Sequence, residues 1–565
     1  MRSRNLSAVR RLLAAATLSI ATAPAGEVDA ERLNRAHEDT ANWLTYYGSY
    51  RSWRYSPLDQ IDRSNVESLR PVWAFESGIT DGGMQSAPIV VDGVMYVATA
   101  WNQVFALNAA TGELLWRYAY AKPEQFPTLY GPWNRGVAVA YGLVYMGTLD
   151  NHVVAIDRES GKEVWRVEVE NARQCGCNIT SAPLVVKDVV ITGVTGGDSA
   201  HRGYLNAFDA RTGRHRWRFW TIPGPGEPGH DTWEGDSWRY GGGSTWITGT
   251  YDPKLDLLYW AVGNPAADFY GEEREGDNLY TDSVVALDPD SGELKWHYQQ
   301  IPHDVWDYDT AYEIVLLDIE VDGRPRKTIL NPSKSGHVWL LDRVNGEFIA
   351  AWPLVEASNW ITGIGPDGEL LGRNEPRVGE TSFICPAIGG GRSWNHGAYS
   401  PDTGWFYSTG LEWCQTLTVR REEPQEGMPF FGGDFQMAHP QDGNARSHLS
   451  AYDPVTGERK WQYDHKYPLL ASQLATAGGL VFTGDATGRF IALDDRTGRE
   501  LWSFRTGSGH RGSAVTYTVD GRQFIATPSG WGSALAGLTT QLWPEAADFP
   551  TGSSIFVFAI GEESK

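Results

Sequence analysis

Short apolar runs alternate with turn residues along most of the chain. The stretch 87–107 places two apolar strands around Asp-Gly, and 478–493 places two around Ala-Thr-Gly. Runs of this length, bounded by Gly, Asp and Thr, are typical of antiparallel hairpins. The pattern therefore predicts an all-β protein.

One hairpin pattern recurs as Ala-x-Asp-x-x-Thr-Gly-x-x-x-Trp, in which x after Ala is apolar and Ser can replace Thr. An apolar strand ends in Asp, Thr-Gly supplies the residue with positive φ, and the next strand runs toward Trp. Six copies and one degenerate copy span 106–116, 155–165, 207–217, 286–296, 451–461, 492–502 and, degenerate, 340–350. Trp73 resembles the end of an eighth unit, whose sheet would combine strands from both ends of the chain.

Each repeat predicts a four-stranded antiparallel sheet, which cannot bury both of its faces alone. Stacking the sheets around an axis buries the faces and leaves few open edges. We therefore expect an eight-bladed β-propeller with docked Trp residues, in one domain that covers 26–565. Extra length falls in 221–241, 265–282 and 415–447, and long loops in a compact ring usually shape a site or bind a partner.

The first 25 residues are typical of an export signal. Four Arg residues precede an apolar stretch that is too short to span a bilayer, and Ala23-Pro24-Ala25 offers a small-residue cleavage site. A cytoplasmic amphipathic start is the alternative. No later segment is apolar enough to cross a membrane, so we expect a soluble, periplasmic protein.

The chain is acidic, with a formal charge of −22 that becomes −26 when the four Arg of 1–25 are removed. This sign disfavours nucleic-acid binding and suits either a basic protein partner or solubility alone. None of the four Cys lies in a Cys-x-x-Cys-His motif, so no covalent c-type haem is encoded. Electrons from any oxidation would have to leave to another molecule.

The repeats, the opening segment NWLTYYGSYRSWRYSPLDQI (42–61) and the closing segment 474–509 resemble the PQQ-dependent alcohol and methanol dehydrogenases. The resemblance covers about 42–560. It implies oxidation of an alcohol to an aldehyde or ketone by pyrroloquinoline quinone (PQQ) and one metal ion, with a c-type cytochrome as electron acceptor.

The motif HDVWDYD (303–309) carries the expected metal chemistry. Asp307 and Asp309 alternate with Tyr308, so on a strand they would face the same side. The resemblance implies that Asp307 is the catalytic base and a metal ligand. Asp309 resembles the lanthanide-using branch, so a lanthanide is favoured over Ca²⁺, since a trivalent ion prefers an additional hard carboxylate.

Two further segments are similar to metal-binding stretches of the family. AVGNPA (261–266) supplies Asn264, and an amide oxygen is a hard donor suited to either ion. VTGGDSAHRGYL (194–205) places Asp198 where the family has a Glu, so this arm is one methylene shorter. Solvated acidic turns and an Asn-Pro turn are the structural alternatives.

The resemblance also implies cofactor contacts, with a flat Trp beneath the quinone and cations near its carboxylates and carbonyls. The matching residues are Gln85, Arg135, Thr180, Trp246, Lys334 and Asn395. Gln85 stands where the family usually has Glu. Each residue alone is compatible with a structural role, and their joint order carries the resemblance.

Two departures bear on the substrate. The family commonly has adjacent disulfide-bonded Cys residues where this chain has Leu129-Tyr130, and a Trp where it has Leu470. We therefore expect a substrate bulkier than methanol. The resemblance implies a Cys385–Cys414 disulfide, whereas Cys175 and Cys177 are either a strained pair or reactive thiols.

Two other functions fit part of the sequence. A non-catalytic scaffold of outer-membrane protein assembly explains the repeats and the export signal but not the motifs around Asp307, Asn264 and Trp246. An enzyme of the same class that acts on sugars or aldehydes fits the metal cluster less well.

Overall fold

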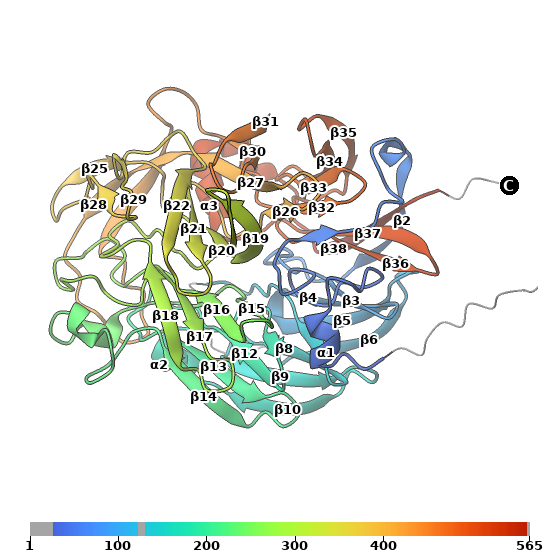
Figure 1. Cartoon of the computed structure of the whole chain (residues 1–565), viewed down its shortest axis with the longest axis horizontal. Helices are drawn as coiled ribbons and strands as arrows, with labels where there is room; N and C mark the ends of the chain where they lie inside the picture. The colour runs from blue at the N-terminus through green and yellow to red at the C-terminus, as the bar shows by residue number, and fades with distance from the viewer. Residues whose placement is uncertain (1–25, 122–129, 562–565) are drawn as a thin grey trace, which may run out of the picture.

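The computed structural model describes residues 26–121 and 130–561. The expected export signal, 1–25, and Leu129 lie outside the described residues. In the described part, eight sheets of four or five strands and two smaller sheets form a mostly β molecule. Figure 1 shows the chain passing from sheet to sheet around the molecule, so that the last strands, in red, lie beside the first, in blue.

The first four sheets each contain four consecutive antiparallel strands. Their strands are β3 (Ile89–Val91), β4 (Val94–Thr99), β5 (Gln103–Asn108), β6 (Leu114–Ala119); β7 (Ala138–Ala140), β8 (Leu143–Gly147), β9 (His152–Asp157), β10 (Glu163–Glu168); β11 (Leu184–Val186), β12 (Val189–Thr192), β13 (Tyr204–Asp209), β14 (His215–Trp220); and β15 (Thr250–Asp252), β16 (Leu257–Ala261), β17 (Ser283–Leu287), β18 (Leu294–Gln299).

The next three sheets continue this order, and β1 adds a parallel edge strand to the last of them. Their strands are β19 (Val315–Val321), β20 (Arg324–Pro332), β21 (His337–Asp342), β22 (Phe348–Pro353); β26 (Ala398–Ser400), β27 (Trp405–Glu412), β30 (Arg446–Tyr452), β31 (Arg459–His465); and β1 (Tyr55–Ser56), β32 (Leu474–Thr476), β33 (Leu480–Gly484), β34 (Arg489–Asp494), β35 (Glu500–Arg505).

The remaining large sheet joins the two ends of the chain. β36 (Val515–Val519), β37 (Arg522–Ser529) and β38 (Ser554–Ile560) are followed in the sheet by β2 (Leu69–Glu76). β2 pairs antiparallel with β38, with Leu69 opposite Ile560. The strand that carries Trp73 thus shares a sheet with the C-terminal strands, as the sequence predicts.

Each sequence repeat forms the hairpin between the last two strands of a sheet, and in most repeats its Trp packs on a glycine of the next hairpin, whereas Trp502 packs on Phe490 and Phe558. Trp217, at the start of one such strand, lies against Gly292, where an added Cβ would come within 2.6 Å of the indole. Trp217 Nε1 also donates to the Pro289 carbonyl at 2.9 Å. The same contact joins Trp73 to Gly112, Trp116 to Gly161, Trp165 to Gly213, Trp296 to Gly346, Trp352 to Gly457 and Trp461 to Gly498.

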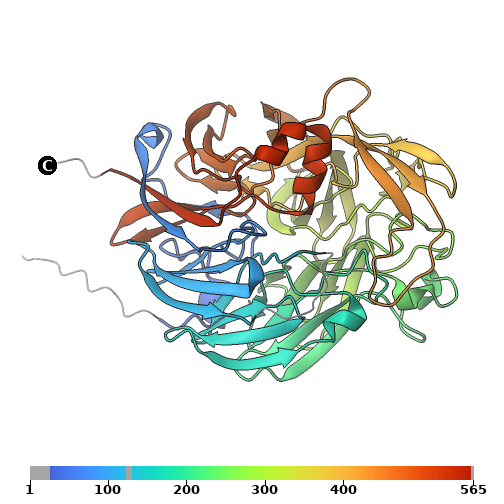
Figure 2. The same cartoon turned by 180° about the vertical axis from the view of Figure 1, so that it is seen from behind.

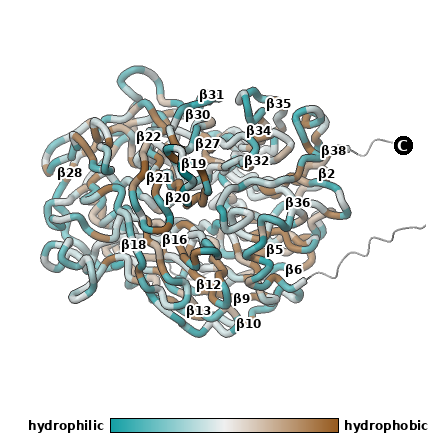
Figure 3. The backbone as a smooth tube through the Cα atoms, viewed as in Figure 1, coloured by the Kyte–Doolittle hydropathy of each residue, from teal (hydrophilic) through white to brown (hydrophobic). Residues whose placement is uncertain are grey.

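The degenerate repeat makes the same Trp-to-glycine contact with a Trp two residues later in the sequence. It has Ala350 where the other repeats have Trp, and Trp352 makes the contact with Gly457 instead. The inner strands of the sheets are buried, and Figure 3 shows brown stretches in strands such as β16 and β20 against teal outer loops.

The segment 415–447, which the sequence analysis treats as a long loop, contains two strands. β28 (Cys414–Val419) and β29 (Gly433–Ala438) form a small sheet with β25 (Thr381–Ile384). β23 (Gly363–Ile364) and β24 (Leu370–Leu371) form a two-stranded sheet.

Three short helices complete the elements used below: α1 (Ala30–Asn34), α2 (Ala172–Cys175) and α3 (Ala534–Leu542). α3 packs against β29, and the Gln541 side chain accepts from Met437 N at 3.0 Å. Figure 2 shows α3, in red, near the orange strands. Within 26–121 and 130–561, no helix is both long and apolar enough to span a bilayer.

A buried ion pair holds the segments that lead into β19 and β26. The Arg392 guanidinium donates two hydrogen bonds to Glu313, one of them at 3.0 Å, and Gly397 N donates to the same carboxylate at 2.8 Å. Burial alone would raise the pKa of Glu313, but the charge of Arg392 and hydrogen bonds from His396 and Arg392 outweigh it and lower the pKa to about 2. The pair fixes two segments that border the site described below.

Gly292→Ala is expected to destabilise the protein more than Gly323→Ala. Both glycines have φ of +72°, so Ala is strained by about 1–2 kcal/mol at either position. At Gly323 an added Cβ meets no atom within 4 Å, whereas at Gly292 it must displace Trp217, at a further cost of about 1–3 kcal/mol. Denaturant unfolding of both variants measures the difference, and equal midpoints would show that the Trp contact adds nothing.

Glu313→Gln is expected to lower stability most near neutral pH. There the variant leaves a buried guanidinium uncompensated, a loss of about 3–5 kcal/mol. Because the pKa of Glu313 falls from 4.5 to about 2 on folding, its contribution is complete above the unfolded pKa and is lost as pH falls toward the folded pKa.

Thermal unfolding of wild type and the Gln variant at about pH 7 and about pH 3 measures this dependence. The gap in stability should narrow on acidification. A gap of constant size would contradict the ion pair.

Candidate active site

The predicted site residues come from equivalent segments of successive sheets. Several lie just before the first strand of their sheet: Gln85, Arg135, Thr180, Trp246, Asp307 and Asp309. Others lie between the second and third strands: Asp198, Asn264 and Lys334. A cavity of about 290 Å³ is lined by all of these except Asn264. The structure therefore brings together residues spread over most of the chain.

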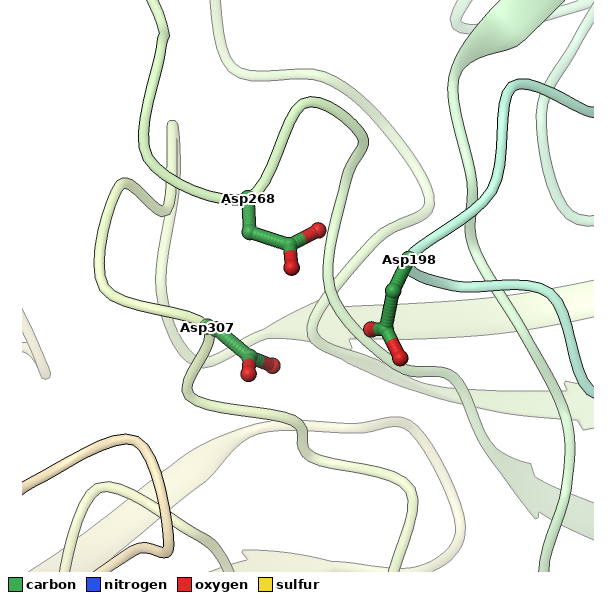
Figure 4. A group of neighbouring side chains, drawn as sticks. All are labelled: Asp198, Asp268 and Asp307. Atoms are coloured by element: carbon green, nitrogen blue, oxygen red, sulfur yellow. The ribbon is translucent and has the colours of Figure 1, made fainter. Parts of the chain in front are cut away.

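Three carboxylates lie close together beside the cavity, which Asp198 and Asp307 line and Asp268 does not. An oxygen of each of Asp198, Asp268 and Asp307 lies within 4.8 Å of one in both others. Figure 4 shows the three side chains entering from separate segments and pointing into a shared space. Asp198 and Asp307 are predicted ligands, and Asp268 is not.

Asn264 contacts this carboxylate group, although it does not line the cavity. Its Nδ2 lies 3.0 Å from Asp268 Oδ1 and 3.4 Å from Asp198 Oδ1. Its Oδ1 is buried and accepts no hydrogen bond among the described residues. A half turn of the amide would present this oxygen to the carboxylate group.

Asp309 lies beside the group rather than within it. Its Oδ1 accepts from Trp246 Nε1 at 3.2 Å and from Asn264 N at 3.4 Å. Asp309 is thus close enough to share a bound ion's surroundings, and it connects the carboxylates to the flat Trp246 side chain.

The segment 303–309 is an irregular loop rather than a strand. Asp307 has φ of +61°, which no strand residue adopts. Asp304 holds the loop, because its carboxylate accepts from Trp306 N at 2.8 Å and from Tyr308 N at 2.7 Å. Asp307 and Asp309 still face the cavity together, while Tyr308 is buried on the other side.

Lys334 is the cation that contacts the carboxylates. Its Nζ lies 2.6 Å from Asp307 Oδ1 and 3.4 Å from Asp309 Oδ2. Burial would lower the pKa of Lys334, but the charges of Asp307 and Asp309 outweigh it and raise the pKa well above its ordinary value. Lys334 therefore stays protonated.

Burial makes the carboxylates poor at holding charge without a cation. It raises the pKa of Asp307 and of Asp268 well above the ordinary value, and burial together with the charge of Asp309 raises the pKa of Asp198 to about 6. A cation would reverse this effect by favouring the ionised form.

The cavity also contains a pair of buried guanidinium groups. Arg135 and Arg511 lie over the Trp394 ring, at 4.6 and 4.8 Å from its centroid, and Arg135 also lies 4.8 Å from the Trp246 ring. Burial lowers the pKa of Arg135 to about 10; burial and repulsion from Arg135 lower that of Arg511 to about 9. The Nε of each is buried without a hydrogen-bond partner in the described chain, as suits a flat polyanionic ligand.

The remaining predicted cofactor contacts differ in placement. Thr180 Oγ1 accepts a hydrogen bond from Arg135, and Gln85 Nε2 donates to the Gly532 carbonyl at 3.1 Å. Asn395 does not line the cavity; it is hydrogen-bonded to Arg511 through both its amide nitrogen and oxygen. Asn395 thus orients a guanidinium rather than lining the site.

One side of the cavity is apolar. Phe431 and Phe435, in and near β29, face Leu535 and Leu538 of α3, and Ile388 lies with them on the lining. The two Phe residues belong to the insertion after β28, the two Leu residues belong to the segment between β37 and β38, and Ile388 precedes β26. Leu470, by contrast, is buried in the packed interior and does not line the cavity.

All four Cys are disulfide-bonded. Cys385 is joined to Cys414, the pair that the resemblance implies, and Cys175 is joined to Cys177, so these two are not free thiols. Gly176 packs against Gly427, whose N donates to the Ala200 carbonyl at 3.0 Å. The Cys175–Cys177 disulfide therefore supports the loop that carries Asp198.

Sequence reasoning missed Asp268, Arg511 and Trp394. Asp268 follows Asn264 by four residues in the segment between β16 and β17, and Arg511 lies shortly before β36, as Arg135 lies shortly before β7. Trp394 lies directly before Asn395. The position of each within its repeat unit was the available signal.

The chain matches a known protein family. A sequence model of the family described as "Glucose/ethanol/alcohol dehydrogenase, beta-propeller domain" matches residues 43–358, and one described as "Outer membrane protein assembly factor BamB" matches 410–548. Quinoprotein alcohol dehydrogenase PedH of Pseudomonas putida is 35% identical over 90% of this chain and 89% of its own. A quinohemoprotein alcohol dehydrogenase of Comamonas testosteroni is 36% identical over 92% and 77%.

Solved structures agree with the sequence comparison. A europium-containing methanol dehydrogenase superposes with a TM-score of 0.88 at 32% identity, over 94% of this chain and all of that one. The quinohemoprotein alcohol dehydrogenase of Comamonas testosteroni also superposes with a TM-score of 0.88. The fold is thus a β-propeller, and the chain belongs to the family of quinoprotein, PQQ-dependent alcohol dehydrogenases.

Proposed function

We propose that the protein is a periplasmic oxidoreductase that oxidises an alcohol to an aldehyde or ketone and passes the electrons to a c-type cytochrome. The observation that carries the proposal is the cavity itself. A wall of buried carboxylates beside Lys334 faces the same space as two buried guanidiniums stacked on Trp394. One side suits a hard cation and the other a flat polyanion such as PQQ.

The residues present fit both groups. Asp198, Asn264, Asp307 and Asp309 would hold the metal ion, and the unpaired oxygen of Asn264 supports this assignment. Gln85, Arg135, Thr180, Trp246 and Lys334 would contact PQQ, whereas Asn395 would act on it through Arg511. The chemistry that the bound groups supply is two-electron acceptance by the quinone and polarisation of its carbonyl by the cation.

The chain supplies proton transfer and orientation. Asp307 would accept the proton of the substrate hydroxyl, since its carboxylate faces the cavity and a bound cation would keep it ionised. Lys334, whose Nζ lies 2.6 Å from Asp307 Oδ1, would stabilise negative charge that develops on the quinone oxygens. Trp246 would form the flat floor.

The apolar side of the cavity supports a substrate larger than methanol. Phe431, Phe435, Leu535 and Leu538 offer hydrocarbon surface that a single methyl group cannot cover. Burying each additional methylene of a substrate there contributes about 0.8 kcal/mol. We therefore propose an aliphatic or aromatic alcohol of several carbons as substrate.

We also propose that the propeller has eight blades joined by docked Trp residues. The support is the eight large sheets in the described chain and the repeated Trp-to-Gly contacts. A non-catalytic scaffold would share these features, but it gives no reason to bury several carboxylates around one space.

Purified protein supplied with PQQ and either Ca²⁺ or La³⁺ should oxidise alcohols in a dye-reduction assay. Alcohols of several carbons should give a higher kcat/KM than methanol. Asp307→Asn should lower kcat by about 10²–10⁴-fold because the base is lost. Glu320→Gln, at an exposed position, is the control. No uptake of PQQ or metal would refute the enzyme, and a strong preference for methanol would refute the substrate class.

Asp309→Ala should remove activity supported by La³⁺ and spare part of that supported by Ca²⁺. An additional hard carboxylate matters more to a trivalent than to a divalent ion. The measurement is the same assay with each ion in turn. Wild-type protein that responds to Ca²⁺ alone would overturn the lanthanide assignment.

A further inference from the structure

Asp268 is a buried carboxylate with an oxygen atom that has no hydrogen-bond partner among the described residues. It lies between β16 and β17 and is completely buried. One of its oxygens accepts from Asn264 Nδ2 at 3.0 Å, whereas Oδ2 has no hydrogen-bond partner among the described residues. A buried carboxylate oxygen without a partner is unfavourable by about 1–3 kcal/mol or more. The two side chains that meet here therefore each have one acceptor oxygen without a partner, Oδ2 of Asp268 and Oδ1 of Asn264.

The spacing of the carboxylates suits coordination of one ion. Oxygens bound to a common large cation lie about 2.3–2.6 Å from it, so they can be no more than about 5 Å apart. Oxygens of Asp198, Asp268 and Asp307 meet this limit, since they lie within 4.8 Å of one another. Figure 4 shows the Asp268 carboxylate directed between the other two.

Neighbouring cations do not account for Asp268. Lys334 Nζ contacts Asp307 and Asp309. The donors of Arg274 are used on the Ala267 and Asp304 carbonyls and on Asn278 Oδ1. Among the described residues, Asp268 therefore makes no hydrogen bond to either cation.

The backbone on both sides of Asp268 is fixed. Arg274 Nη2 donates to the Ala267 carbonyl at 2.8 Å, and Phe269 N donates to the Phe431 carbonyl at 2.9 Å. The side chain therefore cannot leave the group without breaking buried hydrogen bonds. A position fixed in this way is typical of a preorganised ligand.

The charges around this point favour a trivalent cation. Asp198, Asp268, Asp307 and Asp309 act on one another electrostatically, and Lys334 opposes them. Arg274, Asp282 and Asp304 are also buried and act on this group, so six carboxylates and two cations formally leave four negative charges. A trivalent ion would compensate more of this buried charge than a divalent ion.

We propose that Asp268 is a direct ligand of the metal ion and that it shifts the site toward trivalent over divalent cations. The proposal rests on the metal-dependent function proposed above. Oxygen ligands from Asp198, Asp268 and Asp307 surround the ion, and Asn264 completes this side once its amide oxygen faces inward.

The test compares Asp268→Asn with wild type and with Asp277→Asn. The Asn side chain keeps the size of Asp and removes the charge, and Asp277 is an exposed carboxylate on the same segment. Each protein, supplied with PQQ and freed of metal by a chelator, is titrated with Eu³⁺ or Ca²⁺, and bound metal is measured by equilibrium dialysis. Luminescence lifetimes of bound Eu³⁺ in H₂O and D₂O count its water ligands.

Asp268→Asn should weaken Eu³⁺ binding by at least about 10–100-fold. This is the loss of affinity that follows mutation of residues that only hydrogen-bond to metal ligands, and loss of a direct ligand should be no smaller. It should weaken Ca²⁺ binding less and alter the number of water molecules on Eu³⁺, whereas Asp277→Asn should behave as wild type. Unchanged Eu³⁺ affinity and hydration in Asp268→Asn would overturn the proposal.

Two outcomes keep this proposal separate from the proposed function. If wild type binds neither ion, the metal-dependent function fails, whereas wild-type binding with an unaffected Asp268→Asn overturns the role of Asp268 alone. If Asp268→Asn does not fold, anomalous scattering from Eu³⁺ in wild-type crystals decides. An ion farther than about 3 Å from both Asp268 oxygens would refute direct coordination.

Discussion

The packing of a Trp side chain on the glycine turn of the next sheet is the contact on which the rest of the structure depends. A single sheet cannot bury both faces, and the bare glycine admits an indole at a distance that any Cβ would prevent. The contact repeats around the molecule, and β2 joins β38. Each sheet therefore places the segment before its first strand, and the segment between its second and third strands, in an equivalent position. Side chains that are far apart in sequence, such as Gln85 and Arg511, consequently line one cavity.

Burying like charges side by side makes the unliganded cavity electrostatically unfavourable. Buried like charges repel, and this repulsion together with burial raises the pKa of Asp198, Asp268 and Asp307. Two guanidiniums share one Trp ring on the other side. Each wall is unfavourable alone, and each becomes favourable when a ligand of opposite charge binds. The propeller must therefore supply the stability that keeps both walls in place, because the site residues do not.

The sequence predicts the scaffold better than the site, for a physical reason. Hairpin strands, the glycine of each turn and the shared first and last sheet follow from local periodicity, so the pairing of β2 with β38 was predictable. Asp307 and Asp309 were found through a motif, but their loop is irregular because Asp304 binds the backbone of residues 306 and 308. Asp268 and Arg511 belong to no motif that was recognised, and their roles depend on long-range packing. Asn395 was placed near the cofactor, yet its hydrogen bonds go to Arg511.

The small outer sheet contacts the loop 303–309 through the packing of Ile384 with Trp306 and Tyr308 and through a hydrogen bond. Tyr308 O–H donates to the Pro386 carbonyl at 2.6 Å, and Pro386 follows Cys385, which the disulfide joins to Cys414 at the start of β28. The same sheet, through β29, carries Phe435 to the apolar side of the cavity. Since Tyr308 lies between Asp307 and Asp309, the insertion that shapes the substrate side also fixes the carboxylates. Under the proposed function, this structural unit couples binding of the substrate to the position of the base.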